Sequence, residues 1–168
     1  TPEGLLRAAQ GGDVLLATPF LWARLGQAGP ELPQGVAGVT SGAPSDKDTW
    51  AASRALGLIR LTEVYGASET GGVGMRTAED APFALMPDIR RQAQDLWRPG
   101  APAPLPLQDD LAWISPTDFT VQGRKDHMVQ VGGINVSPTA VARALEDSGL
   151  AQEAAVRLEG DRLKAFVV

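Results

Sequence analysis

Segments typical of strands and of helices alternate over residues 1–64, and this order restricts the possible folds more than any other feature. Apolar, strand-like runs occur at 14–17, 36–39 and 58–64. The segments between them carry helix-start signals and apolar residues at helical spacing. Since neighbouring parallel strands need a long crossover connection, usually a helix, the order predicts an α/β fold with a parallel sheet covered by helices.

The predicted helices have recognisable ends. Thr1-Pro2 and Thr18-Pro19 each place a capping hydroxyl before a proline at the first helical position. Ser45, followed by Asp48, predicts the cap of the third helix, and Gly57 predicts its end. The residues of the second helix that we expect to face the sheet are Phe20, Leu21 and Leu25.

The pattern changes after Gly72. Short apolar segments at 73–76 and 83–86 predict a small β region. The prolines between Trp97 and Pro106 predict a stiff surface connection, and Ser137-Pro138 predicts the start of another helix. Further strands are expected at 119–122, 128–131, 154–158 and 163–168. Because the sequence ends within the last of these, we expect the chain to be a piece of a longer protein.

Composition restricts the function classes. The chain has 15 basic and 20 acidic residues, a net charge of −5, which argues against a general binder of nucleic acids or anionic membranes. It has no cysteine, which excludes disulfides, thiolate metal sites and cysteine nucleophiles and fits a reducing compartment. No apolar run reaches membrane-spanning length and the first residues do not form a signal peptide, so we expect a cytoplasmic protein.

The stretch from Tyr65 to Gly72 carries most of the chemistry. It reads Tyr-Gly-Ala-Ser-Glu-Thr-Gly-Gly and follows the third apolar run. An aromatic ring can stack on a base, a hydroxyl can donate to a phosphate, and a carboxylate can hold magnesium. Open α/β sheets bind ligands at the carboxyl ends of their strands. The stretch therefore favours a nucleotide site, and a simple polar turn leaving the strand is the alternative.

Three stretches, in this order, resemble the adenylate-forming superfamily, which includes acyl-CoA synthetases, luciferases and peptide-synthetase adenylation domains. The run 41–44, Ser-Gly-Ala-Pro, resembles the family's adenine-side loop. The run 65–69 resembles its Tyr-Gly-x-Thr/Ser-Glu motif. The runs 123–126, Gly-Arg-Lys-Asp, and 129–138 resemble its hinge and the following glycine-rich segment, in wording similar to small bacterial 4-coumarate-type ligases.

The resemblance implies a domain organisation. Residues 1–122 would be the C-terminal part of the large nucleotide- and acid-binding domain, a parallel sheet with covering helices plus a small β region. Residues 123–168 would be the hinge and the beginning of a small α+β C-terminal domain, with Asp126 as the hinge residue.

The resemblance also implies roles for individual residues. Gly42, Ala43 and Pro44 would present backbone to one face of adenine, and Tyr65, followed by Gly66, would cover the other face. In the next positions of the motif, Ser68 would donate a hydrogen bond to the α-phosphate and Glu69 would hold magnesium.

Other implied contacts fall in the C-terminal third. Asp110 would bind the ribose hydroxyls, with Asp109 as a competing candidate, and a turn before a strand is an equally good interpretation of both. Arg124 would contact the ribose side. Gly132 and Gly133 would line the channel for the acceptor thiol, although they also suit a tight bend.

The implied activity is ATP-dependent conversion of a small carboxylic acid to an acyl-adenylate, then transfer to the thiol of coenzyme A. Magnesium would accompany ATP and AMP. The alternatives are an adenylation domain that loads a carrier protein, or a truncated, non-catalytic nucleotide-binding or interaction module. Since the family's phosphate loop and catalytic lysine have no counterpart in the sequence, we expect these 168 residues alone to be inactive.

Overall fold

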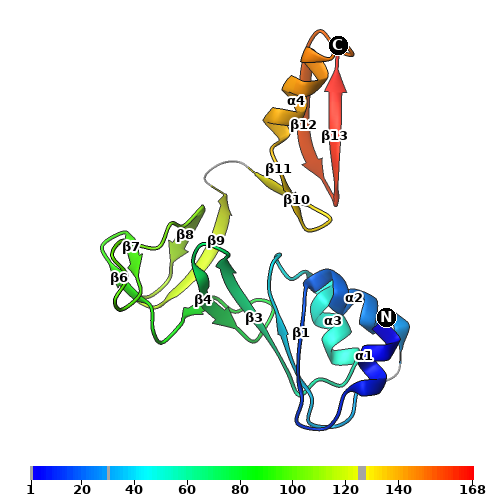
Figure 1. Cartoon of the computed structure of the whole chain (residues 1–168), viewed down its shortest axis with the longest axis vertical. Coiled ribbons are helices and arrows are strands. Elements are labelled where there is room, and N and C mark those ends of the chain that lie inside the picture. The colour runs from blue at the N-terminus through cyan, green and yellow to red at the C-terminus, as the bar shows by residue number, and fades with distance from the viewer. Residues whose placement is uncertain (1, 30, 125–127) are drawn as a thin grey trace. The chain divides into compact units, whose positions relative to one another are not determined.

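The computed structural model describes residues 2–29, 31–124 and 128–168, which fall into two compact units (Figure 1). Unit 1 contains Thr1–Leu107 and Ala112–Thr120, and unit 2 contains Gln108–Leu111 and Val121–Val168. None of the helices in the described ranges has the length and apolarity needed to cross a bilayer.

Three parallel strands and three helices form the first part of unit 1. The strands pair in the order β1-β2-β3, with Val14 opposite Ala37 and Thr40 opposite Glu63. The α/β class predicted from the alternation is therefore confirmed. The strands are β1 (Val14–Ala17), β2 (Ala37–Thr40) and β3 (Arg60–Ala67). The helices are α1 (Pro2–Ala8), α2 (Pro19–Ala28) and α3 (Lys47–Ala55).

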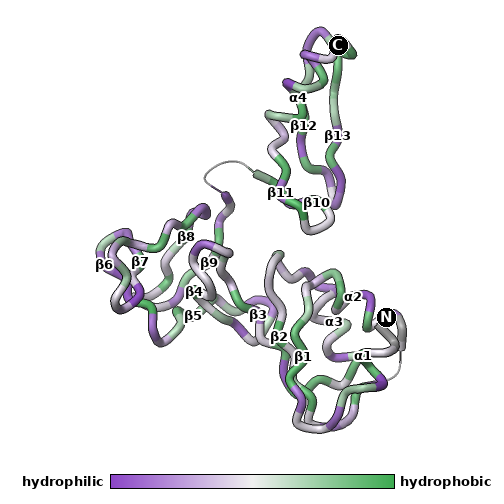
Figure 2. Tube along the Cα trace, in the orientation of Figure 1, coloured by the Kyte–Doolittle hydropathy of each residue, from purple (hydrophilic) through white to green (hydrophobic). Residues whose placement is uncertain are grey.

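The small β region is continuous with these parallel strands. After β3 the sheet continues in the order β4-β5-β9-β8, and the β3–β4, β4–β5 and β5–β9 pairs are antiparallel. The strands are β4 (Gly71–Arg76), β5 (Phe83–Leu85), β8 (Asp109–Trp113) and β9 (Asp118–Arg124). A separate hairpin of β6 (Arg90–Gln92) and β7 (Asp95–Trp97) was not expected, because its residues are largely hydrophilic, as Figure 2 shows for β6.

The helices lie on one side of the parallel strands (Figure 1), and the core forms between them. Trp22 is fully buried, and its Nε1 donates a hydrogen bond to the carbonyl oxygen of Val39 over 3.2 Å. Leu25 is also buried, as predicted, and Leu21 packs partly against the core. The prediction for Phe20 is wrong, because this side chain is 70% exposed. Two positions along a helix differ by about 200°, so Trp22 and Phe20 cannot share the sheet-facing side.

Of the helix ends predicted in unit 1, two are correct and one is wrong, and the predicted cap at Thr1 lies outside the described residues. Thr18 caps α2 by accepting from the amide of Leu21 over 3.3 Å, and Gly57, after α3, has a positive φ of 75°. Asp46, rather than Ser45, caps α3 by accepting from the amide of Thr49 over 2.8 Å. Both residue types are good caps, and the backbone amide of Ser45 is engaged elsewhere.

Unit 2 contains the first residues of β8, the last residues of β9, two hairpins and one helix. Ser137 caps the helix by accepting from the amide of Ala140 over 3.2 Å, as predicted. Within the described part of unit 2, no side chain is fully buried. The elements that lie wholly within unit 2 are the hairpin β10 (Val129–Val131) and β11 (Ile134–Val136), α4 (Pro138–Asp147), and the hairpin β12 (Ala154–Glu159) and β13 (Arg162–Val167).

Candidate functional site

A tight turn between β3 and β4 presents Ser68 and Glu69. The amide of Thr70 donates to the carbonyl oxygen of Ala67 over 3.1 Å, and the hydroxyl of Thr70 accepts from the Ala67 amide over 2.9 Å. Thr70 is 3% exposed, so the turn is anchored from inside. Ser68 and Glu69 occupy its two central positions and are exposed, which leaves both side chains open to a ligand.

The glycines of this stretch allow two strands to approach closely. The β3–β4 register shifts between Tyr65 and Gly66. A Cβ atom on Gly66 would overlap the carbonyl oxygen of Gly71 on the facing strand. Only glycine can therefore lie at position 66 without moving the facing strand. The strand β3 does not end at Tyr65 but continues to Ala67.

The loop after β2 is tied to β3 at both of its ends. The Ser41 hydroxyl donates to the carbonyl oxygen of Val64 over 2.9 Å, and the Ser45 amide donates to Oε1 of Glu63 over 2.9 Å. Between these anchors lie Gly42, Ala43 and Pro44, the predicted adenine-side residues. The fold thus brings this loop next to the strand that carries Tyr65.

The anchor Glu63 is a buried carboxylate that sequence reasoning did not single out. It is 3% exposed, and its Oε2 accepts from Nε of Arg76 over 2.6 Å. Arg76 also donates to the carbonyl oxygen of Glu79 over 2.6 Å and lies over the ring of Phe83 at 4.7 Å. A buried carboxylate needs such a partner because desolvation disfavours an unpaired charge. The available signal was the position of this glutamate two residues after Leu61, which places both side chains on the same face of the strand.

Tyr65 is half-buried and rests against an aromatic group. Its ring centroid lies 5.7 Å from that of Phe83 and 5.5 Å from that of Phe119, the second in an edge contact. Trp113 extends the group, at 5.3 Å from Phe119. These contacts fix the orientation of the tyrosine ring. Its stacking on adenine stays a prediction.

The predicted ribose and hinge residues lie further along the chain. Asp109 and Asp110 begin β8 and Arg124 ends β9, and these two strands are neighbours in the sheet. The interpretation of the aspartates as a turn before a strand is wrong, because both lie within β8. Asp126, the predicted hinge, lies outside the described residues.

Gly132 and Gly133 form the two-residue turn of the β10–β11 hairpin. Their φ angles are 58° and 84°, and a turn with two positive φ angles strongly favours glycine. The tight-bend interpretation therefore describes this hairpin, and the role in a thiol channel stays a prediction.

Magnesium is compatible with the residues at the β3–β4 turn. Within the described ranges, no three histidine or acidic residues cluster as a metal site, and Glu69 forms no ion pair. Magnesium bound with a nucleotide needs only one or two protein carboxylates, since phosphates and water supply its other ligands. The exposed carboxylate of Glu69 can fill that place.

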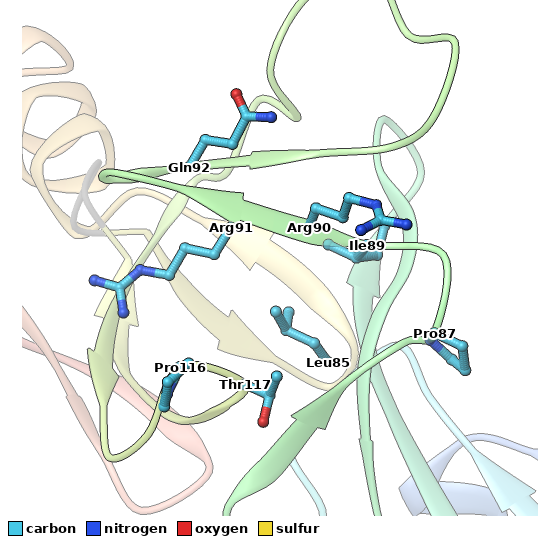
Figure 3. A pocket seen from close by; sticks show the side chains of 8 residues that line it. All are labelled: Leu85, Pro87, Ile89, Arg90, Arg91, Gln92, Pro116 and Thr117. Carbon is cyan, nitrogen blue, oxygen red and sulfur yellow. The ribbon is translucent and has the colours of Figure 1, made fainter.

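A hollow of about 410 Å³ lies elsewhere in unit 1 (Figure 3). Arg91, on its wall, has its guanidinium 4.1 Å from the ring centroid of Trp113. None of the lining residues belongs to the predicted nucleotide set. They are Leu85, Pro87, Ile89, Arg90, Arg91, Gln92, Pro116 and Thr117.

No family model matches the chain, but related proteins are found by sequence. A Rhodobacter capsulatus protein named 4-coumarate–CoA ligase is 53% identical over 167 residues, which cover 99% of this chain and 43% of that protein. A Cereibacter sphaeroides protein of the same name is 45% identical over 98% of this chain and 40% of its own length. The chain thus spans less than half the length of these relatives.

Solved structures share the fold at low sequence identity. A malonyl-CoA ligase complex with methylmalonyl-CoA and AMP matches with a TM-score of 0.73 and 19% identity, over 100% of this chain and 47% of that one. The amide bond synthetase McbA from Marinactinospora thermotolerans matches with a TM-score of 0.71 and 17% identity, over 99% of this chain and 44% of that one. The chain thus has the fold of adenylate-forming enzyme domains. Its sequence relatives are proteins named 4-coumarate–CoA ligase.

Proposed function

We propose that the protein containing this chain is an AMP-forming acid–CoA ligase. Its substrates would be ATP, a small carboxylic acid and coenzyme A. The observation that carries the proposal is the pair of anchored segments at the ends of β2 and β3: the 42–44 loop tied to β3, and the turn that exposes Ser68 and Glu69. The names of the sequence relatives favour an aryl or hydroxycinnamate acid.

In the first step, a carboxylate oxygen of the acid attacks the α-phosphorus of ATP. An oxygen–phosphorus bond forms, the bond to the β-phosphate breaks, and pyrophosphate leaves. Ser68 would donate a hydrogen bond to the α-phosphate, and Glu69 would hold the magnesium that neutralises phosphate charge. The adenine would lie between Tyr65 and the backbone of the 42–44 loop. The step depends on positioning and charge stabilisation, so no protein nucleophile is needed.

In the second step, the thiol of coenzyme A loses its proton and attacks the acyl carbon. A carbon–sulfur bond forms and the bond to AMP breaks. We assign Asp110, with Asp109 as the alternative, and Arg124 to the ribose. Gly132 and Gly133 would lie along the thiol channel. We also propose that the boundary between the large and small domains lies after residue 122 and that Asp126 is the hinge. The proposed compartment is the cytoplasm.

The substitution Glu69→Gln in the full-length protein tests the proposal. It keeps the size of the side chain and removes the charge that would hold magnesium. We expect ATP–pyrophosphate exchange, driven by the carboxylic acid, to fall by on the order of 100-fold or more at saturating magnesium.

Asp80→Asn is a matched control, because Asp80 is also an exposed carboxylate in unit 1. This variant should retain wild-type exchange. Near wild-type exchange from folded Glu69→Gln protein would exclude the proposed metal role, and absence of exchange in the wild-type protein with a panel of aryl and aliphatic acids would exclude the activity.

A further inference from the structure

Arg98 makes three hydrogen bonds, and two of them reach the backbone at the end of the turn that carries Ser68 and Glu69. It directly follows β7, and its Nη1 donates to the carbonyl oxygen of Thr70 over 2.9 Å. Its Nη2 donates to the carbonyl oxygen of Gly72 over 2.8 Å, and its Nε donates to Asp88 over 2.7 Å. One planar side chain thus binds the backbone on both sides of Gly71.

These bonds hold a part of the backbone that the turn does not fix by itself. The bonds between Ala67 and Thr70 close the turn from its N-terminal side. Beyond Thr70 the chain passes through Gly71, whose φ is 62° and which has the conformational freedom of a residue without a Cβ. Arg98 bonds to the carbonyls before and after this glycine, so it restricts the C-terminal side of the turn.

The geometry requires arginine in particular. The guanidinium group presents its donors in a rigid fork, whereas a lysine ammonium is a single point of charge on a flexible stem. The carboxylate of Asp88 accepts a hydrogen bond from the remaining guanidinium nitrogen, Nε, and so fixes the rotation of the guanidinium plane. The side chains of Arg98 and Asp88 are 35% and 54% exposed, so their charge attraction alone contributes little. The two hydrogen bonds to the carbonyls of Thr70 and Gly72, rather than the ion pair with Asp88, are therefore the contacts by which Arg98 acts on the turn.

We infer that Arg98 is a positioning residue that holds the β3–β4 turn so that Ser68 and Glu69 meet the phosphates of the nucleotide and its magnesium. The inference rests on the proposed function, which assigns those two side chains to the phosphates. Arg98 acts through the backbone of Thr70 and Gly72. A displacement of about 1 Å at a reacting group can reduce a rate by on the order of 100-fold, so loss of this support should affect the first step.

The test compares Arg98→Ala and Arg98→Lys with the control Arg90→Ala in the full-length protein. Arg90 is an exposed arginine of the neighbouring β6–β7 hairpin, and its side chain makes no hydrogen bond or ion pair with any residue in the described ranges. Two quantities are measured: hydrogen exchange at the Ala67 and Thr70 amides, and the KM for MgATP and kcat of the adenylation step as magnesium is varied.

We expect Arg98→Ala to speed exchange at both turn amides and to lower kcat/KM for MgATP by about 10- to 100-fold, with a higher magnesium requirement. Arg98→Lys should recover part of each effect, and Arg90→Ala should change neither. A merely structural role would reduce the amount of active protein and leave the KM for MgATP unchanged.

The outcomes separate this inference from the proposed function. Unchanged amide exchange in Arg98→Ala overturns the inference, even if Glu69→Gln abolishes activity. Normal MgATP kinetics in Arg98→Ala also overturns it where Glu69→Gln is inactive. A third outcome is faster amide exchange in Arg98→Ala together with normal MgATP kinetics in both Arg98→Ala and Glu69→Gln. This outcome would show that Arg98 supports the turn, and it would reject the placement of Ser68 and Glu69 at the phosphates.

Discussion

Unit 1 has an interior and unit 2 does not. The buried core of unit 1 is built around Trp22, Leu25, Val36 and Leu56, which lie between helices and parallel strands. In the described part of unit 2, the side chains are at most half-buried. A two-stranded hairpin is marginally stable on its own, and two such hairpins with one helix offer little surface for a core.

The two units also differ in how they use charge. In unit 1 the ion pair between Glu63 and Arg76 is buried, and Glu63 also accepts a hydrogen bond from the Ser45 amide in the loop after β2. In unit 2 the pair between Glu159 and Lys164 is about half exposed on both sides. The same type of contact should therefore matter greatly in one unit and little in the other, because solvent screens the second pair.

The largest expected difference follows from this pair of contacts. Glu63→Ala should lower the free energy of unfolding of unit 1 by about 3–5 kcal/mol, because it leaves the Arg76 charge without its buried partner. Urea unfolding followed by tryptophan fluorescence measures this, since all four tryptophans lie in unit 1.

The matched variant, Glu159→Ala, should cost less than about 1 kcal/mol when unit 2 is followed by hydrogen exchange. Equal losses for the two variants would contradict the distinction between a buried and an exposed pair.

The next difference concerns apolar packing. Leu25→Ala creates a cavity in the core of unit 1 and should cost about 2–5 kcal/mol. Leu145→Ala, on the half-buried side of α4, should cost less than about 1 kcal/mol, because it exposes little additional apolar surface. The same two methods apply, and a cost for Leu145→Ala as large as that for Leu25→Ala would reveal a core in unit 2.

The smallest effect compares two helix caps. The hydrogen bond from the Thr49 amide lowers the pKa of Asp46 below its usual value. Because the pKa is lower in the folded state, the cap stabilises the fold above the unfolded-state pKa, and this contribution is lost as the pH falls through the folded-state pKa. Asp46→Ala should cost about 0.5–2 kcal/mol at neutral pH, and the cost should shrink in acid.

Ser137→Ala in unit 2 is the control for this prediction. Its hydroxyl caps α4 with the same hydrogen-bond pattern but carries no titratable group. Urea unfolding of Asp46→Ala and hydrogen exchange of Ser137→Ala, each from neutral to acid pH, should therefore show a pH-dependent cost only for Asp46. A cost of Asp46→Ala that stays constant down to acid pH would contradict the ionised cap.

Local signals were sufficient for much of the fold. The strand at 14–17 and the caps at Thr18 and Ser137 were predicted correctly, because apolar runs and capping hydroxyls act within a few residues. Where two neighbouring residues could cap α3, a distant contact decided: Glu63 binds the Ser45 amide, and Asp46 caps the helix. The β6–β7 hairpin was missed because its hydrophilic residues lack the alternation of a half-buried strand.

The sequence by itself determined the stretch from Tyr65 to Glu69 and the class of chemistry that those side chains suit, because these groups are adjacent in the chain. Only the tertiary structure decided what holds them in place. Glu63 meets Arg76 13 positions later, and Arg98 reaches back 28 positions to Thr70. Such contacts depend on how strands pair and which carbonyls remain available, and no short-range pattern encodes that.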